Sequence, residues 1–347
     1  MDIKDITEFL RTYDGEKLSF MEVCGTHTAA ISESGIPSLL SDKIRLISGP
    51  GCPVCVTVAD YIDRLCELAL RENTCIVTFG DLIRVPGSES ALQETKSNGG
   101  RIQMVYSPFE ILDLAKQDEN TMFVFAAVGF ETTTPIYAVL LEKIMENHIQ
   151  NIQLLTALKT MPAAIDTLCQ MGGKIDGFIA PGHVSVITGA NAFKPLAEKY
   201  GLPFVVSGFQ AQELLASIYA LVKLRGQGKV LNLYKSAVTE SGNEKAKHLV
   251  NQYFEPCDAV WRGIGKIKHS GMALKEEYSR YDAGSRELVN DHVRNKKCRC
   301  GEVITGFVSP CECPLFSKAC TPENPQGACM VSNEGSCFHY YINNRGQ

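Results

Sequence analysis

The sequence predicts an α/β fold, with two consecutive α/β units built on parallel sheets and a cysteine-rich domain after them. Three observations support this prediction. From residue 44 onward, short β-branched runs alternate with helical patterns. These runs are almost continuously apolar, which is typical of strands in a parallel sheet that is covered on both faces. Only half of the 14 cysteines lie in the first 297 residues, and the others follow among Pro, Gly, Asn and Ser rather than in an apolar pattern.

About eight strands are expected, in two sets of roughly four. The first set comprises residues 44–48, 75–79, 102–106 and 122–128, and the second comprises 152–155, 177–180, 203–206 and 230–233. Helical patterns occupy residues 59–73, 108–117, 134–147 and 211–224. One doubly wound sheet is the alternative. A (β/α)₈ barrel has the same number of strands, but residues 80–100 are typical of a loop.

The ends of the chain differ from this α/β pattern. A charged amphipathic helix is expected over residues 1–20 and another helix over 236–255, before a polar stretch that holds the only tryptophan. The expected segments are 1–42, packed with the C-terminal domain; 43–148 and 149–235, the two α/β domains; and 236–347, a helical domain that carries the cysteine tail.

Composition and charge exclude several classes of partner. With 34 basic and 39 acidic residues and no basic run, the chain is not expected to bind nucleic acid. The N-terminus lacks the apolar segment of a signal peptide, and no run approaches the roughly 18 apolar residues of a membrane span. We therefore expect a cytoplasmic protein, whose thiols are metal-bound or catalytic more often than paired in structural disulfides.

The motif MEVCGTHT, residues 21–28, is the first candidate for chemistry. Cys24 and His27 lie three residues apart, so both side chains can face one ion, and Gly25 permits close approach of the backbone. Thiolate and imidazole suit iron or zinc, and they equally suit nucleophilic catalysis. The structural alternative is a turn that contains a small core cysteine.

The motif SGPGCPVC supplies the second candidate, a CxxC formed by Cys52 and Cys55 between a predicted strand and a predicted helix. A helix N-terminus is expected to lower the pKa of a thiol there, and Pro53 inside the motif is typical of redox-active dithiols. The alternative, half of a four-cysteine zinc site, requires a second CxxC, and the sequence contains none.

Polar residues follow several predicted strands in Gly-rich segments. Glu131 lies in VGFETTTP, His183 in APGHVSVITG and Gln210 in VSGFQAQE. Because open α/β sheets bind ligands beyond the carboxyl ends of their strands, these residues predict a cleft. Each could equally be part of a capped turn. The segments match neither the dinucleotide-binding nor the P-loop pattern.

The tail predicts an iron–sulfur cluster. Its cysteines are spread irregularly over about 40 residues, with spacings too long for a zinc ribbon, whereas a [4Fe–4S] cluster takes four thiolates at the corners of a cube. The surplus cysteines could form a disulfide beside the cluster. A structural zinc site is the alternative.

These motifs, in this order, resemble the HypD-type hydrogenase maturation proteins, which help to build the Fe(CN)₂CO group of [NiFe] hydrogenases. The resemblance covers nearly the whole chain and includes MEVCGTHT, SGPGCPVC, VGFETTTP, APGHVS, VSGFQ and CTPENPQGACMVSNEGSC. It implies two similar α/β domains and a third that holds a [4Fe–4S] cluster. It also implies a small chaperone partner, HypC, with which the protein carries iron, and a cyanide donor, HypE.

The resemblance also implies site residues. Cys24 matches the family's essential cysteine, with His27 beside it, and Cys52 and Cys55 match the dithiol. Of the cluster ligands, three match Cys313, Cys320 and Cys337; we favour Cys300 as the fourth, with Cys298 and Cys329 as alternatives. Cys311 is an extra cysteine relative to the family pattern.

Three functions remain open on these grounds. The first is a redox-active assembly scaffold that binds iron near Cys24 and receives electrons from a tail cluster through the dithiol, in a cleft with Glu131 and His183. The second is a free-standing protein-disulfide reductase that acts through the dithiol. The third is an adaptor with a structural zinc tail.

Overall fold

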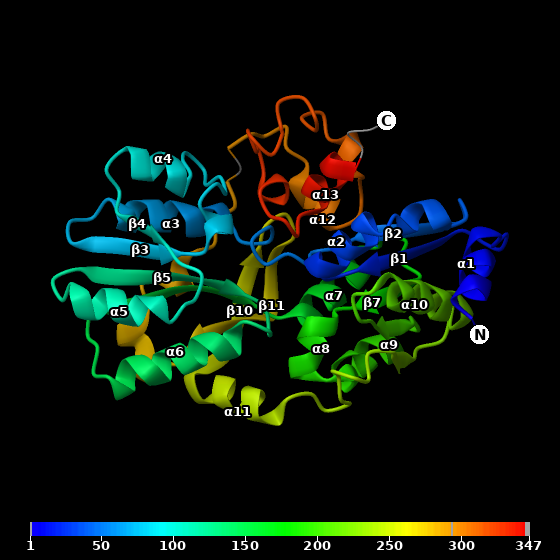
Figure 1. The fold of residues 1–347 in the computed structure, drawn as a ribbon, viewed down its shortest axis with the longest axis horizontal. Coiled ribbons are helices and arrows are strands. Elements are labelled where there is room, and N and C mark those ends of the chain that lie inside the picture. The colour runs from blue at the N-terminus through cyan, green and yellow to red at the C-terminus, as the bar shows by residue number, and fades with distance from the viewer. Residues whose placement is uncertain (1, 293, 344–347) are drawn as a thin grey trace.

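The computed structural model describes residues 2–292 and 294–343 and confirms the predicted α/β class. Two sheets lie side by side, and the cysteine-rich tail covers the region between them (Figure 1). No helix in the described ranges has both the length and the apolar character that a membrane span requires.

The five-stranded sheet is entirely parallel and has the order β2-β1-β7-β8-β9. Its strands are β1 (Leu18–Glu22), β2 (Ile44–Ser48), β7 (Gly177–Ala180), β8 (Phe204–Val206) and β9 (Val230–Asn232). Four of the five were predicted. The exception, β1, overlaps the end of the segment 1–20 that was predicted to be helical, because its five residues LSFME are too few to show strand alternation against the charged helix before them.

The six-stranded sheet is mixed and has the order β10-β11-β6-β5-β3-β4. Its parallel part comprises β3 (Thr74–Thr78), β4 (Ile102–Met104), β5 (Met122–Gly129) and β6 (Ile152–Lys159). An antiparallel hairpin of β10 (Phe254–Trp261) and β11 (Gly265–Leu274) joins the edge of β6. The central strand β5 is buried along nearly its whole length, which explains its continuous apolar sequence.

The prediction that each sheet is formed by one consecutive half of the chain is wrong for two strands. The strand β2 pairs with β1 and joins the later strands β7 to β9, whereas β6 pairs with β5. The predicted division at residues 148 and 149 thus falls between two paired strands. A hydrophobic pattern shows that a strand is buried but does not specify its neighbour, which is why the sequence misassigned these two strands. The domain boundaries themselves stay a prediction.

Helices cover both sheets. They are α1 (Ile3–Arg11), α2 (Gly25–Glu33), α3 (Ala59–Ala69), α4 (Leu92–Ser97), α5 (Glu110–Gln117), α6 (Thr134–Glu146), α7 (Met161–Gln170), α8 (Gly182–Thr188), α9 (Lys194–Tyr200), α10 (Ala211–Lys223), α11 (Glu244–Tyr253), α12 (Cys300–Ile304) and α13 (Ser336–Asn343). The N-terminal segment contacts two distant parts of the chain, since α1 packs against α10 and α2 packs against α13 in the tail.

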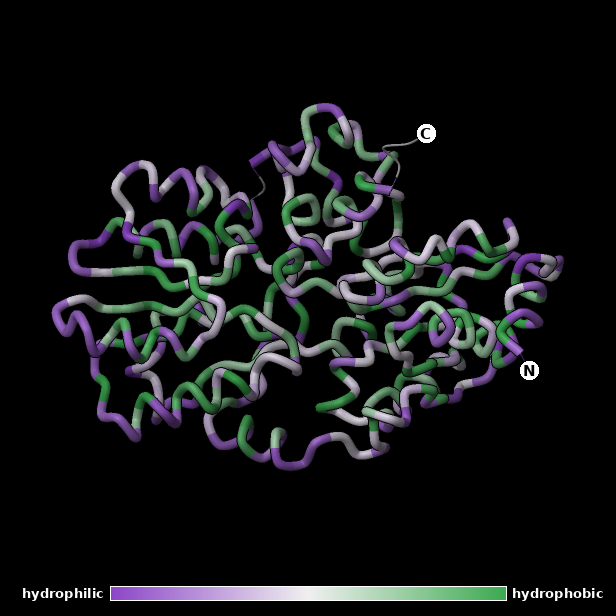
Figure 2. The backbone as a smooth tube through the Cα atoms, in the orientation of Figure 1, coloured by the Kyte–Doolittle hydropathy of each residue, from purple (hydrophilic) through white to green (hydrophobic). Residues whose placement is uncertain are grey.

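The largest hydrophobic core extends across the middle of the molecule and includes residues of both sheets and of the tail. Hydrophilic residues concentrate at the outer loops and hydrophobic residues at the centre (Figure 2). The cysteines Cys52, Cys55, Cys300 and Cys329 belong to this core. The candidate site is therefore central and largely shielded from solvent.

Candidate functional site

Cys24 lies two residues after the end of β1 and directly before the first residue of α2, and its side chain is buried. The loop that carries the dithiol lies against its backbone. Gly25 N donates a hydrogen bond to Gly51 O over 3.0 Å, and a Cβ on Gly51 would lie 2.3 Å from Cys24 N. Only glycine fits at position 51 without displacing this loop. The structure thus brings together the MEVCGTHT and SGPGCPVC motifs.

Two carboxyl groups that sequence reasoning missed flank Cys24. Glu22 Oε2 accepts a hydrogen bond from Cys24 N over 3.0 Å, and Thr28 Oγ1 donates to Glu22 Oε1. Glu334 comes from the tail, and its Oε1 accepts a hydrogen bond from Thr26 Oγ1 over 3.2 Å. Burial raises the pKa of Glu22 to about 7 and that of the Cys24 thiol to about 12. Cys24 is therefore a neutral thiol at pH 7.

His27 points away from solvent into the core and has a defined tautomer. Its Nε2 lies 3.3 Å from Ser207 O and 3.1 Å from Gly208 O, and because both are acceptors, Nε2 carries the proton. Burial lowers the pKa of His27 to about 4, so the ring is neutral. Its Nδ1 is buried and lacks a hydrogen-bond partner among the described residues.

His183, from the predicted strand-end loop, lies on the same side as Cys24. The two residues line one cleft of about 120 Å³, together with Pro53, Thr132 and Glu334. Phe209 lies beside both histidine rings: its centroid is 4.7 Å from that of His27 and 4.1 Å from that of His183. Phe209 lies in the motif VSGFQ and Glu334 in the cysteine-rich tail motif, but neither motif indicated that these side chains reach the cleft, because their contribution depends on tertiary packing.

Glu131 does not point into this cleft, although its neighbours Phe130 and Thr132 line it. Its Oε1 accepts a hydrogen bond from Met161 N over 2.8 Å at the start of α7, and its Oε2 is buried without a partner in the described part of the chain. Burial raises its pKa to about 7. The third strand-end residue, Gln210, is exposed and precedes α10. Of the three, only His183 lines the cleft.

The dithiol lies in a turn before α3, and its two cysteines are 4 % and 1 % exposed. Cys55 N donates a hydrogen bond to Cys52 Sγ over 3.2 Å. The prediction that a helix N-terminus lowers the thiol pKa is wrong for Cys55. Burial raises its pKa well above the ordinary value, and α3 begins only at Ala59, beyond the reach of its first turn.

Six tail cysteines line one small cavity of about 10 Å³: Cys298, Cys300, Cys313, Cys320, Cys329 and Cys337. The seventh, Cys311, is exposed, and its Sγ lies 2.8 Å from Ser309 Oγ. Within the described ranges, no three His, Cys, Asp or Glu side chains converge as ligands of a single metal ion. The sulfurs instead surround a common space.

The dithiol and this cavity are in direct contact through sulfur. Cys300 Sγ lies 2.9 Å from Cys329 Sγ, and the Cys329 thiol is hydrogen-bonded to that of Cys55. Cys298 in turn contacts Cys300. Cysteines that are far apart in sequence therefore form a continuous series of thiols, from Cys55 in the dithiol turn through Cys329 and Cys300 to Cys298 in the tail.

The structure thus holds a buried dithiol, a cysteine-lined cavity in contact with it, and a cleft with one further cysteine, all on an α/β fold. Thiol groups in such a cluster are a candidate site for metal or redox chemistry. Residues 2–344 match the family model HypD, described as the hydrogenase formation hypA family. The chain belongs to this family.

Relatives with curated names agree with this assignment. The chain is 40% identical over 339 residues to hydrogenase maturation factor HypD1 of Bradyrhizobium diazoefficiens, covering 94% of this chain and 89% of that protein. It is 38% identical over 343 residues to hydrogenase maturation factor HypD of Cupriavidus necator, covering 94% and 90%. It is 39% identical over 337 residues to the HypD of Azotobacter vinelandii, covering 94% and 89%.

Proposed function

We propose that the protein is a cytoplasmic scaffold on which the Fe(CN)₂CO group of [NiFe] hydrogenase is assembled. Iron is the cargo and is bound near Cys24 together with a small chaperone of the HypC type. A HypE-type protein donates cyanide, and electrons reach the site from a [4Fe–4S] cluster through Cys52 and Cys55. Membership of the hydrogenase maturation family supports the pathway, and the geometry supports the division of roles among the cysteines.

The observation that carries this proposal is the series of contacts from Cys55 through Cys329 to Cys300. Thiol–disulfide exchange requires one sulfur to attack another directly, so adjacent sulfurs can pass a disulfide along the series. Each disulfide that is reduced takes up two electrons and two protons. The tail is thereby connected to the turn that borders the Cys24 cleft.

The tail residues fit a [4Fe–4S] cluster, because thiolates are its usual donors and six cysteines surround one space. Such a cluster supplies electrons one at a time. We assign Cys313, Cys320 and Cys337 as ligands, as in the sequence-based prediction. For the fourth ligand the geometry favours Cys298 over Cys300, because Cys300 is engaged with Cys329 in the series that leads to the dithiol. The cavity is small, so a cluster would have to spread these sulfurs apart.

Cys24 would supply the soft donor that iron with cyanide and carbonyl ligands requires. The cleft around it offers Thr132 and His183 as polar groups that could orient cyanide nitrogens. The tail residue Glu334 lies against Gly25 and Thr26, next to Cys24, and lines the same cleft.

A free-standing protein-disulfide reductase is less compatible with the structure. Its dithiol must reach a disulfide on another protein, whereas Cys52 and Cys55 are almost fully buried. Outside its own turn, the Cys55 thiol interacts with the tail cysteine Cys329 of the same chain.

The test is an infrared spectrum of the protein purified anaerobically with its chaperone. Native protein should show cyanide and carbonyl stretching bands, and Cys24→Ser should show none, with active [NiFe] hydrogenase absent from the cells. Cys66→Ser is the matched control, since Cys24 and Cys66 are both 7 % exposed and Cys66 lies on α3, outside the cleft. Normal hydrogenase activity with Cys24→Ser would contradict the proposal.

A further inference from the structure

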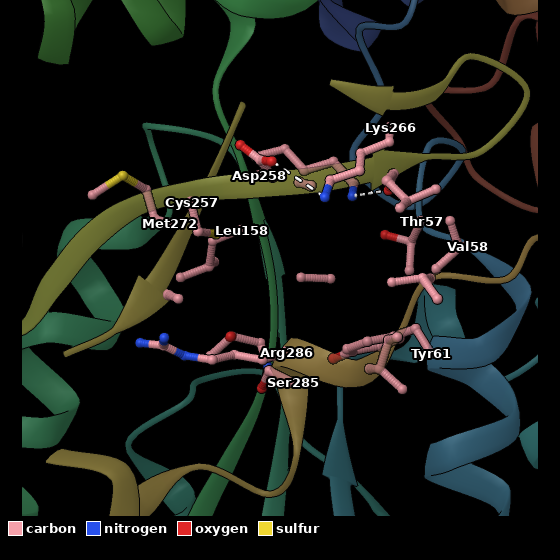
Figure 3. A pocket seen from close by; sticks show the side chains of 18 residues that line it. Thr57, Val58, Tyr61, Leu158, Cys257, Asp258, Lys266, Met272, Ser285 and Arg286 are labelled. Atoms are coloured by element: carbon pink, nitrogen blue, oxygen red, sulfur yellow. Dashed lines mark hydrogen bonds and ion pairs between the residues drawn. The ribbon is translucent and has the colours of Figure 1, made fainter. Parts of the chain in front are cut away.

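A second cavity, of about 230 Å³, lies on the six-stranded sheet (Figure 3). Its walls come from the end of β6, the β10–β11 hairpin, the start of α3 and residues 285–289. In Figure 3, Thr57 and Tyr61 face Cys257 and Met272 across the space. A volume of this size holds about seven water molecules, or a small organic molecule. None of the residues around the Cys24 cleft lines it.

Lys159 gives this cavity a positive charge that has no ion-pair partner among the described residues. Asp291 raises the pKa of Lys159 only from beyond ion-pair distance, and it pairs with Arg262 over 3.6 Å. The side chain is only 4 % exposed, and its Nζ donates a hydrogen bond to Val260 O over 2.7 Å. The ammonium also lies 5.5 Å from the centre of the Trp261 ring. No carboxylate in the described residues lies within ion-pair distance of Lys159. Burial lowers its pKa to about 8, so the group is still protonated at pH 7.

The other cations of the cavity are already neutralised. Lys266 pairs with Asp258 over 3.3 Å, and Arg286 pairs with Glu255 over 2.8 Å. Buried charges in proteins are normally paired, because the desolvation of an isolated ion costs several kcal/mol. The structure therefore leaves one buried ammonium that lacks its counter-ion, beside a space large enough to hold one.

The chemistry of the remaining wall indicates what kind of anion fits. Leu158, Met272 and Leu288 supply apolar surface, and Ala157 leaves room beside them. A bare inorganic anion would leave this apolar surface in contact with water. An anion with a short aliphatic body would fill it and gain from the burial.

We propose that this cavity is a binding site for a small organic carboxylate, whose carboxylate group pairs with Lys159 and whose aliphatic body packs against Leu158, Met272 and Leu288. The site is separate from the Cys24 cleft. Phe130 lines that cleft, and its ring stacks on the Trp261 ring, 5.8 Å away, over which the Lys159 ammonium lies. The carboxylate site does not depend on the proposed role in iron assembly.

Trp261 provides a direct readout, since it is the only tryptophan of the chain and lies beside Lys159. The full-length reduced protein is titrated with butanoate, with n-butanol as the uncharged analogue and inorganic phosphate as the anion without an aliphatic body. Butanoate should change the tryptophan fluorescence with saturation at millimolar concentration or below. n-Butanol and phosphate should bind at least tenfold more weakly.

Two variants test the assigned residues, with calorimetric titration as a readout that does not depend on fluorescence. Lys159→Met removes the charge at similar volume and should weaken butanoate binding at least tenfold. Lys268→Met is the matched control, because Lys268 is an exposed lysine of β11 that does not line the cavity, and it should bind like the native protein.

Ala157→Leu keeps the lysine but fills the space, and it should also abolish binding. If Lys159→Met fails to fold, Ala157→Leu and the uncharged analogue still decide the question. The proposal is overturned if butanoate does not bind at 10 mM (about the weakest affinity of a useful site). It is also overturned if n-butanol binds equally well, if phosphate binds more tightly, or if folded Lys159→Met binds butanoate like the native protein.

Discussion

Replacement of Glu131 by Gln should make the protein more stable above neutral pH but not in acid. The carboxyl group is buried at the start of α7, where Oε1 accepts a hydrogen bond from Met161 N and Oε2 has no partner within the described ranges. The glutamine side chain would retain a carbonyl oxygen for Met161 N and cannot ionise. The substitution therefore removes the charge but keeps the helix cap.

The magnitude follows from the pKa of the carboxyl group, which burial raises from its ordinary 4.5 to about 7. Between these two values the native protein holds a proton that the unfolded chain has released, so a rise in pH lowers the free energy of unfolding. At about 1.4 kcal/mol per pKa unit, the full loss is about 3 kcal/mol once the pH exceeds 7. Below pH 4.5 both states are protonated and the loss vanishes.

The assay is urea denaturation of native protein and Glu131→Gln at several values between about pH 3.5 and about pH 8.5, a range that brackets the two pKa values. The variant should gain about 3 kcal/mol relative to the native protein at the alkaline end and little at the acidic end. Glu198→Gln is the control, since Glu198 is exposed on α9. If native protein and Glu131→Gln lose stability in parallel as the pH rises, Glu131 is not a buried neutral acid and the reasoning fails.

Three further predictions concern the cysteines and the loop between them. Cys298→Ser should lose the iron and sulfide of the tail and Cys300→Ser should keep them; the reverse result would restore Cys300 as the fourth ligand. Cys55→Ala should retain the cluster but leave Cys52 without its disulfide partner, as thiol titration after mild oxidation would show; loss of iron would instead make the dithiol part of the cluster site. Gly51→Ala should lower the free energy of unfolding by about 1–3 kcal/mol, because the added Cβ would lie 2.3 Å from Cys24 N. Gly173→Ala is the control and should be nearly neutral, because no atom lies within 4 Å of the added Cβ. Equal stabilities of the two variants would contradict the close approach at Gly51.

Most strands could be predicted from the sequence, because a strand buried on both faces is apolar along its length, as in β5. Their pairing could not be predicted, since β2 and β6 carry the same kind of pattern as their neighbours and only the tertiary fold assigns them to a sheet. The hairpin β10–β11 was missed for another reason. Polar or partly exposed residues interrupt both of its strands, and such mixed segments resemble loops.

The sequence predicted several residues of the candidate site correctly, but it predicted their spatial arrangement less well. Cys24 and His183 do share a cleft, because parallel strands deliver their following loops to one edge. Glu131 carried the same sequence signal but caps α7 instead. Lys159 had no signal, since a lysine at the end of a strand is ordinarily solvated. Its unusual character arises only because the β10–β11 hairpin covers it.

The CxxC motif drew attention to Cys55, but the physical reason given for its reactivity, a thiol pKa lowered by a helix N-terminus, is incorrect. A nearby helix terminus stabilises a thiolate by at most about 1–2 kcal/mol, and only within its first turn. Desolvation of a fully buried thiolate costs more, so Cys55 stays protonated or joined in a disulfide. A buried thiol cannot undergo disulfide exchange with thiols dissolved in the solvent, because they do not reach it. Its reactivity depends on a sulfur that the fold places beside it, and here the fold places Cys329 there.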